Sequence, residues 1–524
     1  MNGRNLALVV AGLLLAVACG GNNSTGTSTG GGKHGGTLNV AIGIDPDTLD
    51  PAAQTTTTAS QIVDMMVERL YTMDSSGNTV PQLASGDPQV SSDGLTYTIP
   101  LRTGVKFSDG TAFNAAAAKQ SIDRLLDPNT FKTQPGVLSV IASTSAQDDS
   151  HLVVKLKSPF APFVAALTQT NAAILSPVSL TQQGNTAQKV VVPVGTGTYV
   201  FKERVAGDHI TLSANTNYWG TKPNYDTQVI KIVPDDPSRE ALIRSGGADV
   251  IISPPLSDLP ALSKDSTVKV LAAKADRTIF ISIDTVDQNV ALLQKPEVRQ
   301  ALNYAVDKKT IIQNVMFGQA VELDAPMSKT LFGYCSVGTY NYDVNKAKSM
   351  LQAAGASGMT VKLGSPTGRY PQDIKVAQAV AGYLRDAGLN VQGPMTSDWP
   401  TYLGSVNVPP AQAKYDMHLL GWAPAYLDAS QQFEQFRSDR IPPKGLETSY
   451  YSNQQVTDLV VKAGSETDQN QRKTDYCSAS KIVWNDAPWI FLYNQSFPIV
   501  YSSKVTGVGS FPNEKFDTRY ASPA

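Results

Sequence analysis

Segments with the residue pattern of strands alternate with segments that have the pattern of helices along most of this chain. Apolar and polar residues alternate at 37–42 and 278–284, which predicts strands because successive side chains of a strand face opposite ways. Apolar residues three and four positions apart predict helices at 61–70 and 296–306, the second with Pro296 in its first turn. This alternation favours parallel or mixed open sheets covered by helices, so we expect an α/β fold.

Other predicted helices are marked by their ends. Asn114 stands directly before AAAAKQSIDRLL and is expected to cap that helix with its side chain. Helices predicted at 344–354 and 373–387 are each followed by glycine, at Gly355 and Gly388.

Length and composition exclude several classes of protein. The chain has 524 residues, enough for roughly three domains or lobes. Its net charge of −2 lacks the basic surplus of a nucleic-acid binder, so we expect no nucleic-acid partner. Three Cys are too few for a disulfide-dense scaffold, and four His leave little for a His-rich metal site.

The N-terminus carries the pattern of a secretory signal. The run from Leu6 to Ala18 is apolar or small throughout and, at thirteen residues, is too short to span a bilayer core. It ends in Ala16-Val-Ala-Cys19, which resembles a bacterial lipobox. We therefore expect residues 1–18 to be a signal peptide and Cys19 to be lipidated. The alternative is a plain secretory signal in which Cys19 takes no lipid.

Residues 20–36 are nearly all Gly, Ser, Thr and Asn, so 19–36 is expected to be the lipidated Cys followed by a flexible linker. No later stretch approaches eighteen apolar residues. We expect an extracytoplasmic protein that is anchored to the outer face of the cell membrane by the lipid on Cys19 alone.

The other two cysteines, Cys335 and Cys477, would then lie in an oxidising compartment, where a disulfide between them is expected. Two separate buried thiols are the alternative. A catalytic Cys is a weaker third possibility, because no His lies near either residue in the sequence.

The sequence contains no recognisable catalytic constellation. HExxH, GxSxG and a Walker loop are missing, and Ser478-Ala-Ser-Lys481 formally matches SxxK without the KTG triplet that should accompany it. The acidic pairs at 148–149 and 235–236 stand at predicted strand ends, where Asp is ordinary turn chemistry. We expect no enzyme, no metal site and no cofactor.

Several ordered motifs resemble one known family, the extracellular solute-binding proteins of family 5, which are the dipeptide- and oligopeptide-binding components of ABC importers. The fullest match is YTIPLRTGVKFSDGTAFNA at 97–115. The others are PVGTGTYVF at 193–201, NYWG at 217–220, VRQALNYAVD at 298–307, DVNKAKSML at 343–351, GW at 421–422 and DAPWI at 486–490. Together they cover essentially the whole chain past Thr37.

The resemblance implies a two-lobed fold of the periplasmic-binding-protein kind, type II, of the large peptide-binding class, with an extra β-rich subdomain. On this sequence the expected parts are lobe I at 37–82, 194–284 and 490–524, an inserted subdomain at 83–193, and lobe II at 285–489. The chain is expected to cross between the lobes near 282–287 and 489–494.

The implied function is to capture oligopeptides or dipeptides between two closing lobes and deliver them to the permease subunits of an ABC importer, as a monomer. Two alternatives remain open. The first is a receptor of the same class for a non-peptide solute, such as an oligosaccharide, an opine or a metal chelate. The second is a signalling receptor that presents its liganded state to a membrane sensor.

The resemblance also implies ligand contacts. A loop in the first lobe bonds the ligand through its backbone, and here it contains Gln54, Thr55, Thr56 and Thr57. Three aromatic side chains match ligand-facing positions, and these are Trp399, Trp422 and Tyr493.

One position departs from the family pattern. Peptide receptors commonly carry an acid three residues after the Trp of the GW motif, where it holds the ligand's α-amino group. Here that position is Ala425, and the nearest acid is Asp428, three residues further on. Either Asp428 takes the role of binding the amine, or this protein does not bind a free amine.

Overall fold

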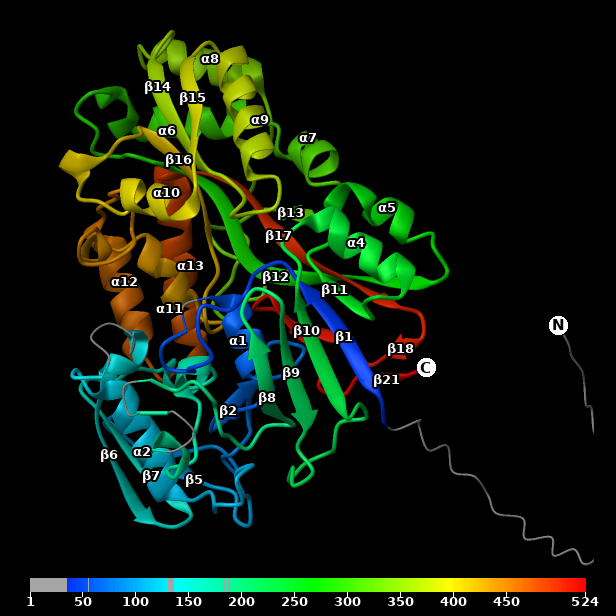
Figure 1. Cartoon of the computed structure of the whole chain (residues 1–524). Coiled ribbons are helices and arrows are strands. Elements are labelled where there is room, and N and C mark those ends of the chain that lie inside the picture. The colour runs from blue at the N-terminus through cyan, green and yellow to red at the C-terminus, as the bar shows by residue number, and fades with distance from the viewer. Residues whose placement is uncertain (1–34, 55, 131–135, 182–184, 187–188) are drawn as a thin grey trace, which may run out of the picture.

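The computed structural model describes residues 35–54, 56–130, 136–181, 185–186 and 189–524. The main sheet of the protein is mixed and has 11 strands. One of them, β13 (Ala320–Glu322), pairs with β17 outside the main strand order. The other strands run in the order β15 (Asn390–Ser397), β14 (Thr360–Pro366), β16 (Met417–Trp422), β12 (Val268–Ile283), β17 (Trp489–Ser502), β11 (Val250–Ile252), β1 (Thr37–Ile42), β10 (Thr227–Ile232), β9 (His209–Ala214) and β8 (Tyr199–Val205). The expected α/β class is confirmed (Figure 1).

Two long antiparallel strands, β12 and β17, run through both halves of this sheet. Their first stretch pairs Val268 to Lys274 with Ser502 to Ser496, and their second begins at Thr278 opposite Asn494. The register shifts between Lys274 and Thr278. In the second stretch the other edge of β12 pairs with β16, whereas in the first stretch the other edge of β17 pairs with β11. Two groups of strands are thus joined through β12 and β17.

Helices cover the half of the sheet that contains β14, β15 and β16, at the top of Figure 1. They include α6 (Pro296–Ala305), α8 (Val344–Ala353) and α9 (Asp373–Asp386). Asp343 caps α8 by accepting a hydrogen bond from the amide of Lys346, and Gly388 after α9 has φ +97°, which an L side chain rarely adopts. These three helices match the predicted ones to within a residue or two.

A separate four-stranded sheet lies at the lower left of Figure 1. Its order is β4 (Gln89–Val90), β5 (Thr96–Pro100), β7 (His151–Leu156) and β6 (Ile141–Asp148), and it packs with α2 (Ala115–Leu126) on its own hydrophobic core. Asn114 caps α2 as predicted, because its side chain accepts a hydrogen bond from the amide of Ala117.

The helix predicted at 61–70 is wrong in its position. Helix α1 (Thr57–Val63) begins earlier, where the Thr56 side chain caps it, and ends at Asp64. The following carbonyl groups bond to a neighbouring segment instead of continuing the helix, because Met66 accepts from the amide of Gly197 at 3.0 Å and Met65 accepts from that of Tyr199 at 2.9 Å.

The other elements are short or lie around the two halves. The strands are β2 (Tyr71–Met73), β3 (Thr79–Pro81), β18 (Val505–Thr506), β19 (Gly509–Phe511), β20 (Lys515–Asp517) and β21 (Ser522–Pro523). The helices are α3 (Phe163–Ala166), α4 (Asp236–Ser245), α5 (Leu259–Leu262), α7 (Lys308–Thr310), α10 (Trp399–Val406), α11 (Ala429–Gln432), α12 (Gln454–Ser465) and α13 (Gln469–Asp486).

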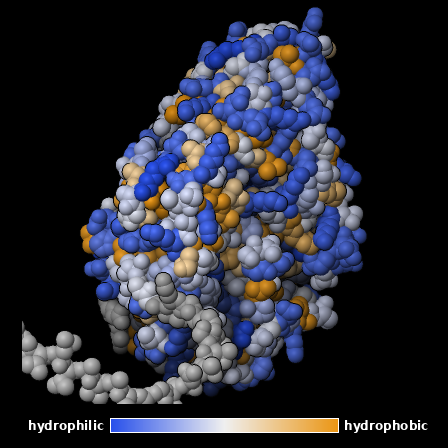
Figure 2. All heavy atoms as spheres, turned by 90° about the vertical axis from the view of Figure 1, so that its right-hand side faces the viewer, coloured by the Kyte–Doolittle hydropathy of each residue, from blue (hydrophilic) through white to orange (hydrophobic). Residues whose placement is uncertain are grey.

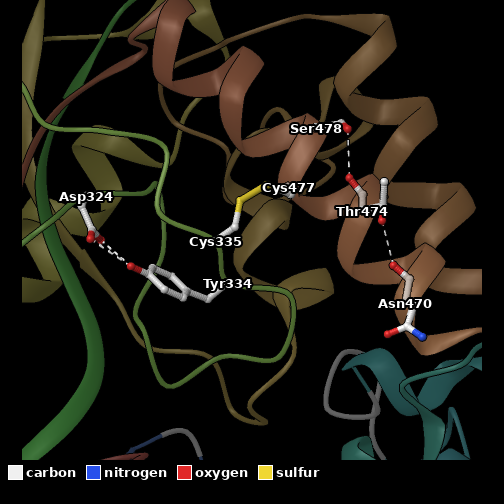
Figure 3. The surroundings of a disulfide bond; sticks show 7 residues. All are labelled: Asp324, Tyr334, Cys335, Asn470, Thr474, Cys477 and Ser478. Atoms are coloured by element: carbon white, nitrogen blue, oxygen red, sulfur yellow. Dashed lines mark hydrogen bonds between the residues drawn. A yellow bond between two sulfur atoms is a disulfide. The ribbon is translucent and has the colours of Figure 1, made fainter.

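A disulfide joins Cys335 to Cys477, as expected from the sequence (Figure 3). Cys335 lies in the long loop after β13, and Cys477 lies on α13. Beside it the Tyr334 hydroxyl donates to the Asp324 carboxylate at 2.9 Å, which ties the loop to itself. A bridge that encloses 142 residues of sequence removes many conformations from the unfolded chain.

No helix among the described residues is long and apolar enough to span a membrane. On the face drawn in Figure 2 hydrophobic residues lie in small groups with hydrophilic residues between them. The signal peptide and Cys19, predicted from residues 1–19, lie outside the described residues.

Buried carboxyl groups near the end of β12 make stability depend on pH. Burial raises the pKa of Asp284 to about 7 and that of Glu447 to about 8. Such a carboxyl binds its proton more tightly in the folded protein, so its contribution to stability is complete below its ordinary pKa near pH 4. The contribution is lost as the pH rises through 7 and 8.

We therefore expect the melting temperature to fall between pH 5 and pH 8.5, with a loss of up to about 1.4 kcal/mol per pH unit for each group that titrates. Glu447→Gln should flatten the fall above pH 7, because the amide cannot ionise, and substitution of the exposed Glu297 by Gln should leave it unchanged. Thermal unfolding followed by circular dichroism over this range checks the prediction. A melting temperature that rises with pH over the same range would contradict it.

Candidate functional site

The register shift of β12 carries a buried ion pair. Arg277 lies within the shift, and its Nε and Nη2 donate to Oε2 of Glu514 at 2.8 and 2.5 Å. Glu514 comes from the loop between β19 and β20, near the C-terminus. Gln495 on β17 donates to the second Glu514 oxygen at 2.6 Å. Both charged side chains are less than one-tenth exposed, so the pair is satisfied from within the protein.

A second arginine faces this pair from the other half of the sheet. Arg369 lies in the loop between β14 and α9, and its guanidinium carbon is 5.2 Å from the ring centre of Tyr370 and 4.9 Å from that of Trp399. The Arg277 guanidinium carbon is 5.9 Å from the same Tyr370 ring. Burial and the neighbouring Arg277 lower the pKa of Arg369. Arg369, Tyr370, Trp399, Arg277 and Glu514 are called the arginine cluster below.

Local structure holds the Arg369 loop in place. The buried carboxylate of Asp373, at the start of α9, accepts hydrogen bonds from the amides of Arg369 at 2.8 Å and Tyr370 at 3.2 Å. The Tyr370 hydroxyl donates to the carbonyl of Gly421 at 3.2 Å. A Cβ atom at Gly421 would come within 2.8 Å of the Tyr370 ring, so this position needs glycine.

Arg369 has no ion-pair partner within the part of the chain that the structure describes. Solvent reaches Arg369, yet protein atoms surround its guanidinium closely enough to desolvate it, because it lies against two aromatic rings and opposite a second arginine. A guanidinium held by aromatic faces keeps its donors available for a planar anion such as a carboxylate. The arginine cluster is therefore suited to bind an anionic group.

Of the predicted ligand residues, Trp399 belongs to this cluster, and Trp422 directly follows Gly421, whose carbonyl accepts from Tyr370. Trp399 opens α10, which Asp398 caps, and packs edge-on against Tyr370 at 6.1 Å between ring centres. Trp422 ends β16 opposite Thr278, and its Nε1 donates to the carbonyl of Gln431 at 3.2 Å. Both indoles are partly exposed.

Asp428 does not join the cluster. Its carboxylate is 3% exposed as a residue, and Oδ2 accepts from Nη2 of Arg472 at 2.6 Å. Oδ1 accepts from the Tyr476 hydroxyl at 3.2 Å and from the amide of Ser430, where it caps α11. In this arrangement the charge of Asp428 is neutralised by Arg472, so the carboxylate is occupied within the protein.

The described residues of the predicted loop, and Tyr493, form hydrogen bonds within the protein that do not involve the arginine cluster. Gln54 accepts from the Ser60 hydroxyl at 2.8 Å, Thr56 caps α1, and Thr57 begins that helix. Thr55 lies outside the described residues. Tyr493 is 1% exposed and its hydroxyl donates to the sulfur of Met316 at 3.3 Å. These contacts are local or belong to the core.

A narrow cavity lies behind the Glu514 loop, between α1 and the β19–β20 hairpin. It is lined by Asp64, Arg69, Lys515, Asp517 and Arg519, among others. Asp64 pairs with Arg69 and Lys515, and Asp517 pairs with Arg519, so the charges of this cavity balance one another. Among the described residues no group of three or more His, Cys, Asp or Glu side chains is placed to hold a metal ion.

Arg277 and Arg369 were not among the residues predicted from the sequence. A partial signal for Arg369 was present, because it stands shortly before the helix predicted at 373–387, but strand β14 in front of it was not predicted. Ligands of open α/β sheets lie beyond the carboxyl ends of strands, so predicting this strand would have pointed to the loop that carries Arg369. Nothing local marks Arg277, which depends on an acid 237 residues away in the sequence.

Because Asp428 neutralises a buried arginine, its removal should destabilise the protein. Asp428→Ala leaves the Arg472 guanidinium buried without a counter-ion, which we expect to cost about 3–5 kcal/mol in urea unfolding. Asp439→Ala, which breaks the half-exposed pair with Arg437, is the control and should cost less than about 1 kcal/mol. Unchanged stability of Asp428→Ala with loss of peptide binding would instead assign Asp428 to the ligand's amine.

Comparison with known proteins identifies the family of this chain. Residues 78–442 match the family described as "Bacterial extracellular solute-binding proteins, family 5 Middle". The chain is 30% identical over 480 residues to the glutathione-binding protein GsiB of Pectobacterium atrosepticum, across 91% of this chain and 92% of that protein.

Solved structures agree. DppA of Helicobacter pylori, an ABC transporter-associated periplasmic binding protein solved with the peptide STSA, matches with a TM-score of 0.78 and 26% identity over 94% of this chain and 98% of that one. The substrate-binding protein CtaP of Listeria monocytogenes, at 20% identity, matches with a TM-score of 0.83 over 94% of this chain and all of that one, which supports the fold.

These matches confirm the resemblance inferred from the motifs and the two-lobed type II fold expected from it. Proteins of this kind bind solutes outside the cytoplasm and catalyse no reaction, so the expectation of a non-enzyme is confirmed by the family. The chain belongs to the bacterial extracellular solute-binding proteins of family 5.

Proposed function

We propose that this protein captures peptides between its two lobes outside the cytoplasm and delivers them to the permease subunits of an ABC importer. The observation that carries the proposal is the arginine cluster, which presents an unpaired guanidinium where the two halves of the main sheet meet. A relative at 30% identity is named for binding glutathione, and a solved neighbour at 26% identity holds a peptide.

In this proposal Arg369 binds the carboxylate of the peptide. A charge-assisted hydrogen bond contributes about 1.5–3 kcal/mol, and the fork of donors in a guanidinium matches the two oxygens of a carboxylate. Trp399 and Trp422 supply apolar surface, and each indole also carries one N–H group. Such a surface suits a peptide ligand whose side chains vary. Gln54 to Thr57 remain proposed backbone contacts from the facing loop.

The proposal is tested by native mass spectrometry of the protein starting at Gly20, incubated with a peptic digest of casein. We expect a ladder of adducts at peptide masses, and Arg369→Gln should reduce the bound fraction at least about tenfold because the charge-assisted contact is lost. Lys375→Gln is the matched control, since it removes an exposed positive charge from the neighbouring helix α9.

Retention of the same peptides by Arg369→Gln would remove the arginine from the proposal. If the wild-type protein retains no peptide from the digest, the peptide function itself is wrong. A single non-peptide adduct carried through purification would then favour a receptor for another solute.

We also propose that Cys19 carries the lipid that holds the protein at the outer face of the membrane, with residues 1–18 removed as a signal peptide and 20–36 acting as the linker. Cys19→Ala, expressed as the full chain in bacteria with lipoprotein-processing enzymes, should move the protein from the membrane fraction to the soluble extracytoplasmic fraction. Wild-type protein already in the soluble fraction, with an unmodified N-terminus by mass spectrometry, would favour the plain secretory signal.

The division into lobes is proposed as lobe I at 37–82, 194–284 and 490–524, the inserted subdomain at 83–193, and lobe II at 285–489. The register shift of β12 supports a first crossing nearer Lys274 to Thr278 than the expected 282–287. The second crossing would lie beside Asn494. Closure about these strands would be a hinge motion, which buries the ligand and gives the permease a distinct liganded shape to bind.

A further inference from the structure

We infer that this receptor recognises its peptide through a carboxylate without requiring a free α-amino group, so that N-terminally blocked peptides are ligands as good as free ones. This inference rests on the proposed function and narrows its substrate class. It follows from the state of the acidic side chains that surround the arginine cluster, each of which already accepts hydrogen bonds or is enclosed in the described part of the chain.

Two acids, Glu514 and Asp428, already accept hydrogen bonds from arginines of the protein. Glu514 is 5% exposed, with one oxygen accepting twice from Arg277 and the other accepting from Gln495. Asp428 accepts from Arg472 and Tyr476. An ammonium that approached either carboxylate would have to displace an arginine already held at 2.5–2.6 Å.

Asp276, the residue before Arg277, is enclosed by the protein. Its side chain is fully buried and neither carboxyl oxygen has a hydrogen-bond partner. Burial and the nearby Glu514 raise the pKa of Asp276 well above its usual range, which disfavours its charged form. A carboxyl enclosed on every side is not placed to contact the ammonium of a ligand.

The two other acidic side chains near the cluster accept hydrogen bonds from backbone amides. Asp373 accepts from the amides of Arg369, Tyr370 and Ile374. Asp398 is exposed and caps α10 through the amide of Thr401 at 3.2 Å. The Asp398 carboxylate is thereby engaged at the first turn of α10.

The position that could have supplied an acid holds Ala425 instead. Its side chain is exposed, and its amide donates to Oε1 of Gln431, so the turn is closed by a neutral side chain. The uncommitted charge beside the cluster is therefore that of Arg369, and it is positive. Removing an ammonium from water next to two arginines would cost free energy that no acid here repays.

Competition between free and blocked peptides tests the inference. A peptic digest of casein is divided, one half is acetylated with deuterated acetic anhydride, and the halves are mixed in equal amounts before native mass spectrometry of the protein starting at Gly20. For peptides without lysine we expect free and acetylated forms to be retained within about threefold of each other. A synthetic peptide recovered in this way should bind at least about tenfold more weakly after its C-terminus is amidated.

A matched pair of variants gives a second measurement. Ala425→Asp places an acid beside the cluster and should create a preference for the free over the acetylated form, whereas Ala411→Asp adds the same charge at an exposed position of a distant turn and should not. Rejection of acetylated peptides by the wild-type protein, by tenfold or more, overturns the inference and leaves the peptide function standing. If the wild-type protein retains neither free nor acetylated peptides, the proposed peptide function is wrong.

Discussion

The pairing of β12 with β17 is the constraint on which the rest of the molecule depends. Each strand contributes to both halves of the main sheet, and between them they connect the strands that end at β8 to those that end at β15. Buried apolar residues of both strands enter hydrophobic clusters on either side of the sheet. A displacement of one half against the other must therefore be absorbed where their register shifts, between Lys274 and Thr278.

The same shift explains why charged side chains are buried at this place. A regular ladder would satisfy the backbone through strand pairing, but the shift leaves room for Arg277 and brings the Glu514 loop against it. Asn494 on β17 donates to the carbonyl of Arg277 at 3.2 Å, which restores a contact that the irregular pairing loses. Breaking such a buried pair by removing one partner is costly, so the pair fixes the C-terminal loop relative to β12.

Much of the fold was predictable because it is encoded locally. The cap at Asn114, the proline that opens α6 and the glycine after α9 each act within a few residues, and the helices were placed correctly from them. The helix predicted at 61–70 failed because its spacing of apolar residues serves burial, while the backbone there bonds to Gly197 and Tyr199. These hydrogen-bond partners lie more than a hundred positions away in the sequence, so the local pattern of residues does not indicate them.

The site was predictable only in part, for a related reason. Trp399 and Trp422 were predicted as ligand residues from motifs, yet a motif does not tell whether an acid is available. From the sequence Asp428 was a candidate for binding the ligand's amine, and only the fold places Arg472 on it. Binding specificity is set by which charges remain unpaired after folding, and pairing is decided by long-range contacts. The candidate site therefore presents a positive charge because its acidic side chains already bond to other residues of the protein. Arg369 stays available because Glu514 is held by Arg277.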